Sequence, residues 1–266
     1  MTPSEQLASL LLARLGVRGK PDLQVIADRI GLRIREVDVD GFDGTLVRAL
    51  DGAKGVIGVK RSMRENTRKR FTIAHEMGHY LIPSHRTREN VCSTKMIESW
   101  QPGLDSEELE ANEFAAALLL PASLVRQPLG LSEPSLPRIS RAAADFEASL
   151  TATTLRFLAL TDLSCAMIWS EDGQARWWKA SEAFPFFLPK GVLPARTSFA
   201  GKLFAGETAP NEFSPINPAL WLKSRDVERV GLLLEHSVLL EDDGAAFTLL
   251  WADSGRRVVD LEGDDS

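Results

Sequence analysis

The sequence predicts an α+β protein of three segments, and the prediction rests on its helix, strand and turn patterns. Residues 1–125 combine helical patterns with three strand-like runs, residues 126–162 predict a pair of helices, and residues 163–266 predict mainly hairpins. We therefore expect an N-terminal α+β domain, a helical connector and a mixed, β-rich C-terminal domain. A chain of 266 residues, 44% of them hydrophobic, is long enough to form about two compact cores.

The first 60 residues predict two helices and then a small sheet. The opening stretch MTPSEQLASLLLARLGV predicts an amphipathic helix, and PDLQVIADRIG predicts a short helix that Gly31 ends. Three strand-like runs follow, LRIREVDV, GTLVRAL and GVIGVK, separated by turn residues at Asp40, Gly41, Asp51 and Gly52. An exposed edge of such a sheet can bind an extended peptide through main-chain hydrogen bonds.

A helix with metal-binding spacing follows in FTIAHEMGHYLIP, residues 71–83. His75 and His79 are four positions apart, so both imidazoles lie on one helix face and can bind one ion, with Glu76 beside it. This His-Glu-x-x-His pattern is typical of zinc hydrolases, in which the glutamate is the general base for a metal-bound water. The alternative is a buried helix with two incidental histidines, but buried His and Glu side chains need partners. Pro83 ends the helix.

A catalytic zinc site needs a third protein ligand, and the residues offer several. His85 stands ten positions after His75, as in metzincins, but Ile82 replaces the glycine of that pattern, which favours an exposed loop histidine. The stretch DSEELEANEFAAALLLPASL predicts a helix that Asp105 or Ser106 caps and Pro121 closes. On it Glu108 leads an apolar stripe and is the favoured ligand. Glu107, Glu110 and Glu113 compete with it, and an acidic first turn in solvent is the alternative.

Two motifs together resemble the ImmA/IrrE family of metallopeptidases. They are RFTIAHEMGHYL, residues 70–81, and ELEANEFAAALLLP, residues 108–121, in the family's order and spacing. The resemblance implies a zincin-like domain, zinc on His75, His79 and Glu108, with manganese as an alternative metal in the cell, and Glu76 as the catalytic residue. It also implies endoproteolysis of a helix-turn-helix repressor, which would switch on stress or mobile-element genes.

Composition predicts a cytoplasmic protein without a disulfide framework. The only cysteines, Cys92 and Cys165, are far apart, and no apolar run reaches the length of a membrane span. The N-terminus lacks the positive region of a signal peptide. Residues 60–70 carry six basic residues and one acidic residue, but the net charge is −6, which favours a solvated helix start over a nucleic-acid site.

The stretch QPLGLSEPSLP, residues 127–137, predicts a linker or irregular connection, and the remainder predicts a helical hairpin and then antiparallel strands. RISRAAADFEASLTATTLRFLALT predicts two helices, the second capped by Thr151, at the place where family relatives carry a helix-turn-helix. Hairpins are predicted with turns at 171–174 and 242–244, and acids outnumber bases after residue 162. Residues 163–266 could sense a ligand or bind a partner. A non-proteolytic, metal-stabilised binding module and a DNA-binding regulator are the alternative functions, and the oligomeric state stays open.

Overall fold

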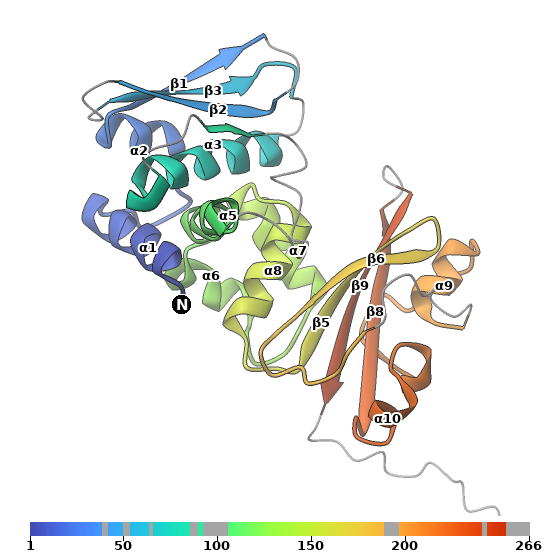
Figure 1. Cartoon of the computed structure of the whole chain (residues 1–266). Helices are drawn as coiled ribbons and strands as arrows, with labels where there is room; N and C mark the ends of the chain where they lie inside the picture. The colour runs from blue at the N-terminus through green and yellow to red at the C-terminus, as the bar shows by residue number, and fades with distance from the viewer. Residues whose placement is uncertain are drawn as a thin grey trace, which may run out of the picture. The chain divides into compact units, whose positions relative to one another are not determined.

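The computed structural model of the chain divides into two compact units (Figure 1). The residues it describes are 1–38, 42–49, 54–63, 66–85, 90–92, 106–188, 197–240 and 244–253. Unit 1 comprises Met1–Pro128 and Ser140–Arg156, and unit 2 comprises Leu129–Ile139 and Phe157–Ser266. The predicted α+β class is confirmed. The helical segment 126–162 contributes to both units, and its status as a separate connector remains a prediction.

Unit 1 contains a four-stranded sheet in the order β1-β3-β2-β4. Its strands are β1 (Leu32–Val37), β2 (Gly44–Arg48), β3 (Gly55–Lys60) and β4 (Asn90–Cys92). β1 and β3 are parallel, whereas β2 runs antiparallel to both β3 and β4. The three strands predicted from the sequence are thereby confirmed, although the turn residues Asp40, Gly41, Asp51 and Gly52 lie outside the described residues.

The helices of unit 1 lie in layers below this sheet (Figure 1). They include α1 (Pro3–Leu15), α2 (Leu23–Arg29), α3 (Asn66–Leu81) and α5 (Ser106–Leu119). α3 contacts β2 and β3 on one side and α5 on the other, and α1 packs against α5. Thr2 and Glu5 form a capping box at the start of α1, because each side chain bonds the other's backbone N–H. α3 is therefore a central element, covered by the sheet and by α5.

The segment after α5 is more helical than the sequence predicts. α6 (Ala122–Leu129) continues through Pro128, where the sequence predicts an irregular connection, and α7 (Leu136–Phe146) follows. Pro128 has no N–H to donate to the carbonyl of Leu124, and the helix ends one residue later at Leu129. α8 (Leu150–Leu160) confirms the predicted second helix, but its first turn is capped by Ser149, not Thr151, since the Ser149 hydroxyl accepts from the backbone N–H of Ala152.

Unit 2 is an antiparallel five-stranded sheet with short helices, as predicted. The order is β6-β5-β9-β8-β7, with strands β5 (Cys165–Glu171), β6 (Gln174–Ala180), β7 (Ser214–Ile216), β8 (Leu232–Leu240) and β9 (Ala245–Asp253). Asp172 and Gly173 have positive φ angles of 49° and 72°, which suits the two-residue turn between β5 and β6. The other predicted turn lies between β8 and β9, and of its residues only Gly244 is described.

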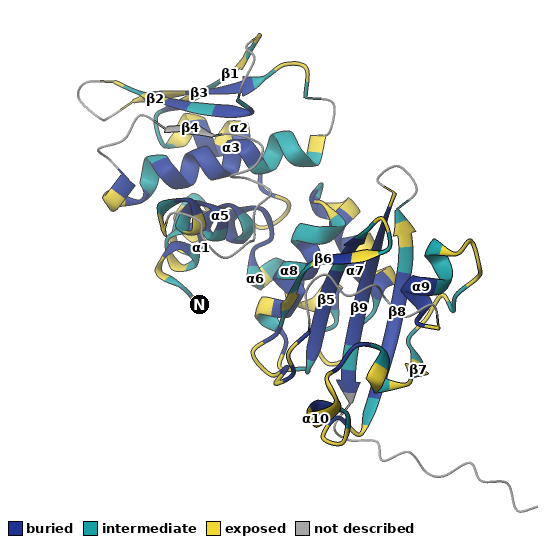
Figure 2. Ribbon diagram, turned by 45° about the vertical axis from the view of Figure 1, so that its right-hand side comes forward, coloured by how far each residue is buried: buried dark blue, intermediate teal, exposed yellow. Residues whose placement is uncertain are grey.

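The core of unit 2 lies between its sheet and its short helices α9 (Phe199–Phe204) and α10 (Ser224–Val227), and strands β5, β8 and β9 are largely buried in Figure 2. A charged side chain, Glu235, lies at 0% exposure within it. Its carboxylate accepts from the Ala200 N–H, the Trp221 indole N–H and the Ser237 hydroxyl, each at 2.7 Å. These three donors offset the cost of removing the charge from water. Within the described part of the chain, no helix is long and apolar enough to cross a membrane.

Gly78 sets the distance between α3 and α5. A Cβ atom at this position would lie 3.2 Å from the Cα of Ala111 and 3.2 Å from a ring carbon of Phe114. Backbone atoms of α5 cannot move aside as a flexible side chain can, so Gly78→Ala should destabilise unit 1 by about 1–3 kcal/mol. Urea unfolding of the metal-free protein measures this loss. Gly19→Ala is the matched control, because a Cβ at Gly19 meets no atom within 4 Å. Equal stability of the two variants would contradict the prediction.

Candidate metal centre

The three motif residues His75, Glu76 and His79 lie in the most buried part of α3. Every residue from 72 to 79 is buried, and these three side chains have 0% exposure. This follows from the position of the helix between the sheet and α5, where the apolar residues around the motif pack on both sides. The polar side chains are therefore held away from water.

His75, His79 and Glu108 converge on one point. The Nε2 atoms of the two histidines are 3.0 Å apart, and the Glu108 carboxylate oxygens lie 3.2 Å from Nε2 of His75 and 3.5 Å from Nε2 of His79. One ligand atom from each residue lies within 4.8 Å of the others. Two imidazoles and a carboxylate are the donors that a catalytic zinc ion takes, and the buried Glu108 charge needs a cation. The residues therefore fit a divalent metal ion.

A hydrogen bond to Nδ1 of His75 leaves its other ring nitrogen, Nε2, available to bind a metal ion. Nδ1 of His75 is 2.9 Å from Oδ1 of Asn112, which lies on α5 one turn after Glu108. A carbonyl oxygen only accepts, so Nδ1 carries the proton and Nε2 presents a lone pair to the centre. The sequence places Asn112 on the same stripe as Glu108, but the stripe alone does not assign this hydrogen bond to it.

The pKa directions agree with metal binding. Burial lowers the pKa of His79 and outweighs the opposing effect of the nearby Glu108, so the ring favours its neutral form, which is the form that binds metals. Burial raises the pKa of Glu108, but hydrogen bonds to His75 and His79 outweigh it and hold that pKa below its ordinary value. A neutral His79 ring and an ionised Glu108 carboxylate are the forms that bind a metal ion.

Glu76 contacts the sheet at Gly44, the first residue of β2. A Cβ atom at position 44 would clash with Cγ2 of Thr72 and would lie 3.0 Å from Oε1 of Glu76. The glycine therefore leaves room for the Glu76 carboxylate between α3 and the sheet. The sequence predicts a strand beginning at Gly44, but it does not predict that this residue touches Glu76.

Gly44→Ala should reduce peptide cleavage by about 10- to 100-fold and leave metal affinity near the wild-type value. The added methyl group pushes Glu76 from its position, and if Glu76 is the general base that the sequence predicts, this displacement costs rate without removing a ligand. The double variant Gly44→Ala/Thr72→Ser is the matched test, since serine lacks Cγ2 but keeps the hydroxyl that donates to the Arg68 carbonyl. Partial recovery of cleavage in the double variant supports the contact, and full activity of Gly44→Ala contradicts it.

The competing candidates for a ligand lie elsewhere. His85 is not the exposed loop histidine expected from the sequence, because it is fully buried, but its ring lies beside Nδ1 of His79, the nitrogen that faces away from the centre. Glu107, Glu110 and Glu113 are partly exposed and are not among the residues that converge. The side chain of Cys92 and the proposed cap Asp105 lie outside the described residues.

The basic stretch at the start of α3 is paired with acids inside unit 1. Arg68 forms an ion pair with Asp43 at 2.7 Å, and Lys69 pairs with Glu36 at 2.7 Å. Arg70 donates to the Pro21 carbonyl. Through these contacts, the basic side chains at the start of α3 bind this helix to the rest of unit 1.

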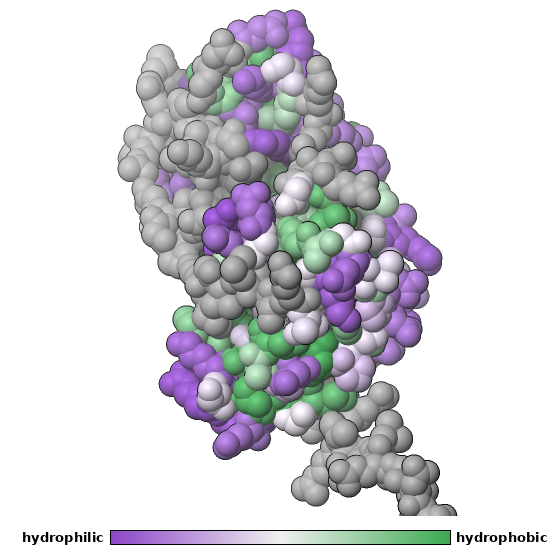
Figure 3. Space-filling model, turned by 90° about the vertical axis from the view of Figure 1, so that its right-hand side faces the viewer, coloured by the Kyte–Doolittle hydropathy of each residue, from purple (hydrophilic) through white to green (hydrophobic). Residues whose placement is uncertain are grey.

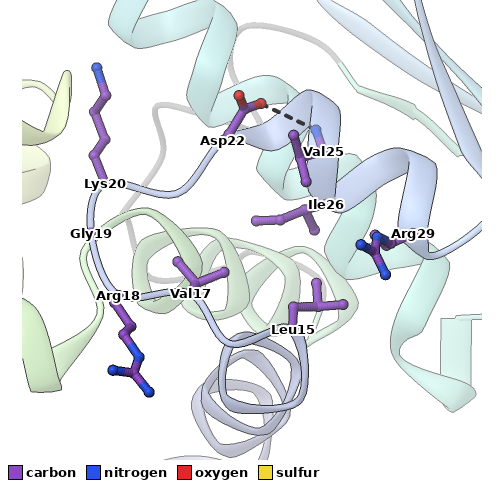
Figure 4. A pocket seen from close by; sticks show the side chains of 9 residues that line it. All are labelled: Leu15, Val17, Arg18, Gly19, Lys20, Asp22, Val25, Ile26 and Arg29. Carbon is purple, nitrogen blue, oxygen red and sulfur yellow. Dashed lines mark hydrogen bonds between the residues drawn. The ribbon is translucent and has the colours of Figure 1, made fainter.

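A cavity of about 230 Å³ lies between the end of α1 and α2 and includes none of the converging residues (Figure 4). Its apolar lining comes from Leu15, Val17, Val25 and Ile26. Arg18 and Lys20 extend in opposite directions from their loop, and Lys20 pairs with Glu147 at 2.5 Å. Because these cations do not converge, the cavity is no anion site.

The part of the chain that carries this centre matches a peptidase family model. Residues 27–158 match the peptidase family model described as the IrrE N-terminal-like domain. A solved structure of a Mycobacterium tuberculosis transcriptional regulator has a TM-score of 0.57 and 16% sequence identity, covering 95% of this chain and 77% of that chain. At this identity the likeness concerns the fold. A search of curated proteins gave no significant match.

Proposed function

We propose that the protein is a zinc-dependent endopeptidase that cuts a specific protein partner, since residues 27–158 match the model of the IrrE N-terminal-like peptidase domain. The observation that carries the proposal is the convergence of His75, His79 and Glu108 beside the buried Glu76. A metal-stabilised fold would need the three ligands, but it would have no use for a buried carboxylate at the position of the general base.

A zinc ion held by these three residues would polarise the scissile carbonyl and lower the pKa of a bound water. Glu76 then takes the proton of the attacking water and passes it to the leaving amine. Asn112 keeps His75 oriented throughout by accepting its Nδ1–H. β4 is an edge strand of the unit 1 sheet and pairs with β2, which contacts α3, so an extended peptide can align along β4 by main-chain hydrogen bonds.

The partner we propose is a helix-turn-helix transcriptional repressor, whose cleavage switches on stress or mobile-element genes. The proposal follows from the two motifs shared with the ImmA/IrrE family, and the fold likeness to a protein described as a transcriptional regulator is in keeping with it. A cytoplasmic location is part of this proposal, since such a repressor acts there.

Unit 2 is the part that we propose selects the partner or senses a ligand. It presents apolar surface among hydrophilic side chains (Figure 3), and Phe187 is 47% exposed beside Lys223, whose ammonium lies 4.8 Å from the ring centre. Binding by a second unit would raise the local concentration of the scissile segment at the metal centre.

The test is incubation of the zinc-loaded protein with the helix-turn-helix repressor encoded nearest to its gene, in parallel with Glu76→Gln. Cleavage by the wild type alone supports the proposal. Binding of the repressor by both proteins without cleavage favours the metal-stabilised binding module, and binding of duplex DNA that weakens steeply with salt favours the DNA-binding regulator. Digestion of unrelated unfolded proteins by the wild type would contradict a specific partner.

A further inference from the structure

We propose that His85 is a positioning residue, which, with Glu110, holds the metal ligand His79 in the tautomer and orientation that zinc requires. The inference rests on the proposed function, because it concerns the metal centre of that function. It assigns a role to a histidine that stands ten positions after His75 and is not a ligand, and to a glutamate that competes with Glu108 in the sequence.

The geometry is a chain of side chains that leads from the centre to the surface. Nδ1 of His79 lies 3.0 Å from Nδ1 of His85, and Nε2 of His85 lies 3.2 Å from a carboxylate oxygen of Glu110. The His85 side chain is 0% exposed, whereas that of Glu110 is 42% exposed. A fully buried histidine with both ring nitrogens within hydrogen-bonding distance of a partner is fixed in its rotamer.

The positions of the protons follow from the two ends of this chain. Nε2 of His79 must present a lone pair to the metal, so the neutral ring carries its proton on Nδ1 and donates it to Nδ1 of His85. His85 then carries its own proton on Nε2 and donates it to Glu110, which as a carboxylate only accepts. His79, His85 and Glu110 each have a single hydrogen-bonding role in this arrangement. Loss of a donor or an acceptor at any of them leaves a buried histidine nitrogen without its partner.

Arg48 binds the main chain of both histidines, His79 and His85. Its guanidinium, on β2, donates to the backbone carbonyls of His79, Tyr80 and His85. The end of α3 and the short 3-10 helix η1 (Pro83–His85) are thereby tied to the sheet at one point. The tie keeps the His85 ring against His79 even though Pro83 has ended the helix between them.

The experiment measures zinc affinity by competition with a chromogenic chelator, in the absence of any protein substrate. His85→Ala should weaken zinc binding by about 10- to 100-fold, the usual effect of losing an outer partner of a ligand histidine. His85→Gln should recover most of the affinity, because its amide can accept from His79 and donate to Glu110. A purely structural requirement for imidazole at this buried position would not be met by glutamine.

Glu110 provides the second measurement. Glu110→Ala should weaken zinc binding in the same direction, and the double variant His85→Ala/Glu110→Ala should be no weaker than His85→Ala, since the two residues act as one unit. Glu107→Ala, a lost carboxylate in the same helix, is the matched control and should bind zinc as the wild type does. Circular dichroism and thermal unfolding of the metal-free proteins check the fold.

Three results would overturn the inference. They are unchanged zinc affinity in His85→Ala, equal weakening in His85→Gln and His85→Ala, and, should His85→Ala not fold, unchanged affinity in Glu110→Ala. A wild-type protein that binds no zinc would remove the proposed function and this inference together. Tight zinc binding and cleavage by the wild type, with unaffected variants, would overturn the inference alone.

Discussion

Glu76→Gln is expected to bind zinc as tightly as the wild type and to show no measurable cleavage of the partner. Glutamine has nearly the shape of glutamate, so the packing against Gly44 and Thr72 is kept. Its amide cannot accept the proton of the attacking water, however, and general acid–base catalysis contributes about 10²- to 10⁴-fold to such reactions. None of the converging ligand atoms belongs to Glu76, so the metal centre should be unaffected.

Two measurements on the same sample decide this prediction. Metal content after dialysis against zinc gives the occupancy, and gel analysis of the incubated repressor gives the cleavage rate. His79→Ala is the contrasting variant, because it should lose both zinc and cleavage. Wild-type cleavage by Glu76→Gln would remove the proposed mechanism, and loss of zinc from it would show that Glu76 serves the metal centre as a ligand.

The parts of the fold and the site that the sequence predicts are those with a local pattern. The strands beginning at Leu32, Gly44 and Gly55 follow from short apolar runs between turn residues. The placement of His75 and His79 on one helix face follows from their spacing of four residues. Glu108 is predicted as a ligand because it leads the apolar stripe of the later helix. The structure brings these three residues together; the stripe alone leaves Glu107, Glu110 and Glu113 as alternatives, and the family resemblance favours Glu108.

The parts that the sequence does not predict depend on contacts between distant elements. Gly44 touches Glu76 only because β2 lies over α3, and Arg48 reaches the carbonyl of His85 across the same contact. His85 follows a helix-ending proline, which is typical of exposed loops, and its burial results from the Glu110 and Arg48 partners that the fold supplies. Local propensity carries no information about such partners.

Glu108→Ala is expected to weaken zinc binding by at least about 100-fold, more than any other substitution of an acidic residue in the first two turns of α5. The side chain supplies one of three protein ligands and the only negative charge among them, and changes in outer partners alone reach about 10- to 100-fold. Without this carboxylate, His75 and His79 must bind the ion alone. Glu107→Ala, one residue earlier and partly exposed, should bind zinc like the wild type.

Substitution of Glu108 by glutamine and by alanine distinguishes the effect of its charge from the effect of its ligand oxygen. Glu108→Gln keeps an oxygen ligand but removes the charge, so its zinc affinity should lie between those of the wild type and Glu108→Ala. Zinc competition with a chelator measures all three, and the unfolding temperature of the metal-free proteins shows whether the fold is kept. Removing the carboxylate also removes its close contacts with Nε2 of His75 and Nε2 of His79, so part of any loss of stability belongs to them. If His85→Ala instead lost more zinc affinity than Glu108→Ala, the third ligand would have been assigned to the wrong residue.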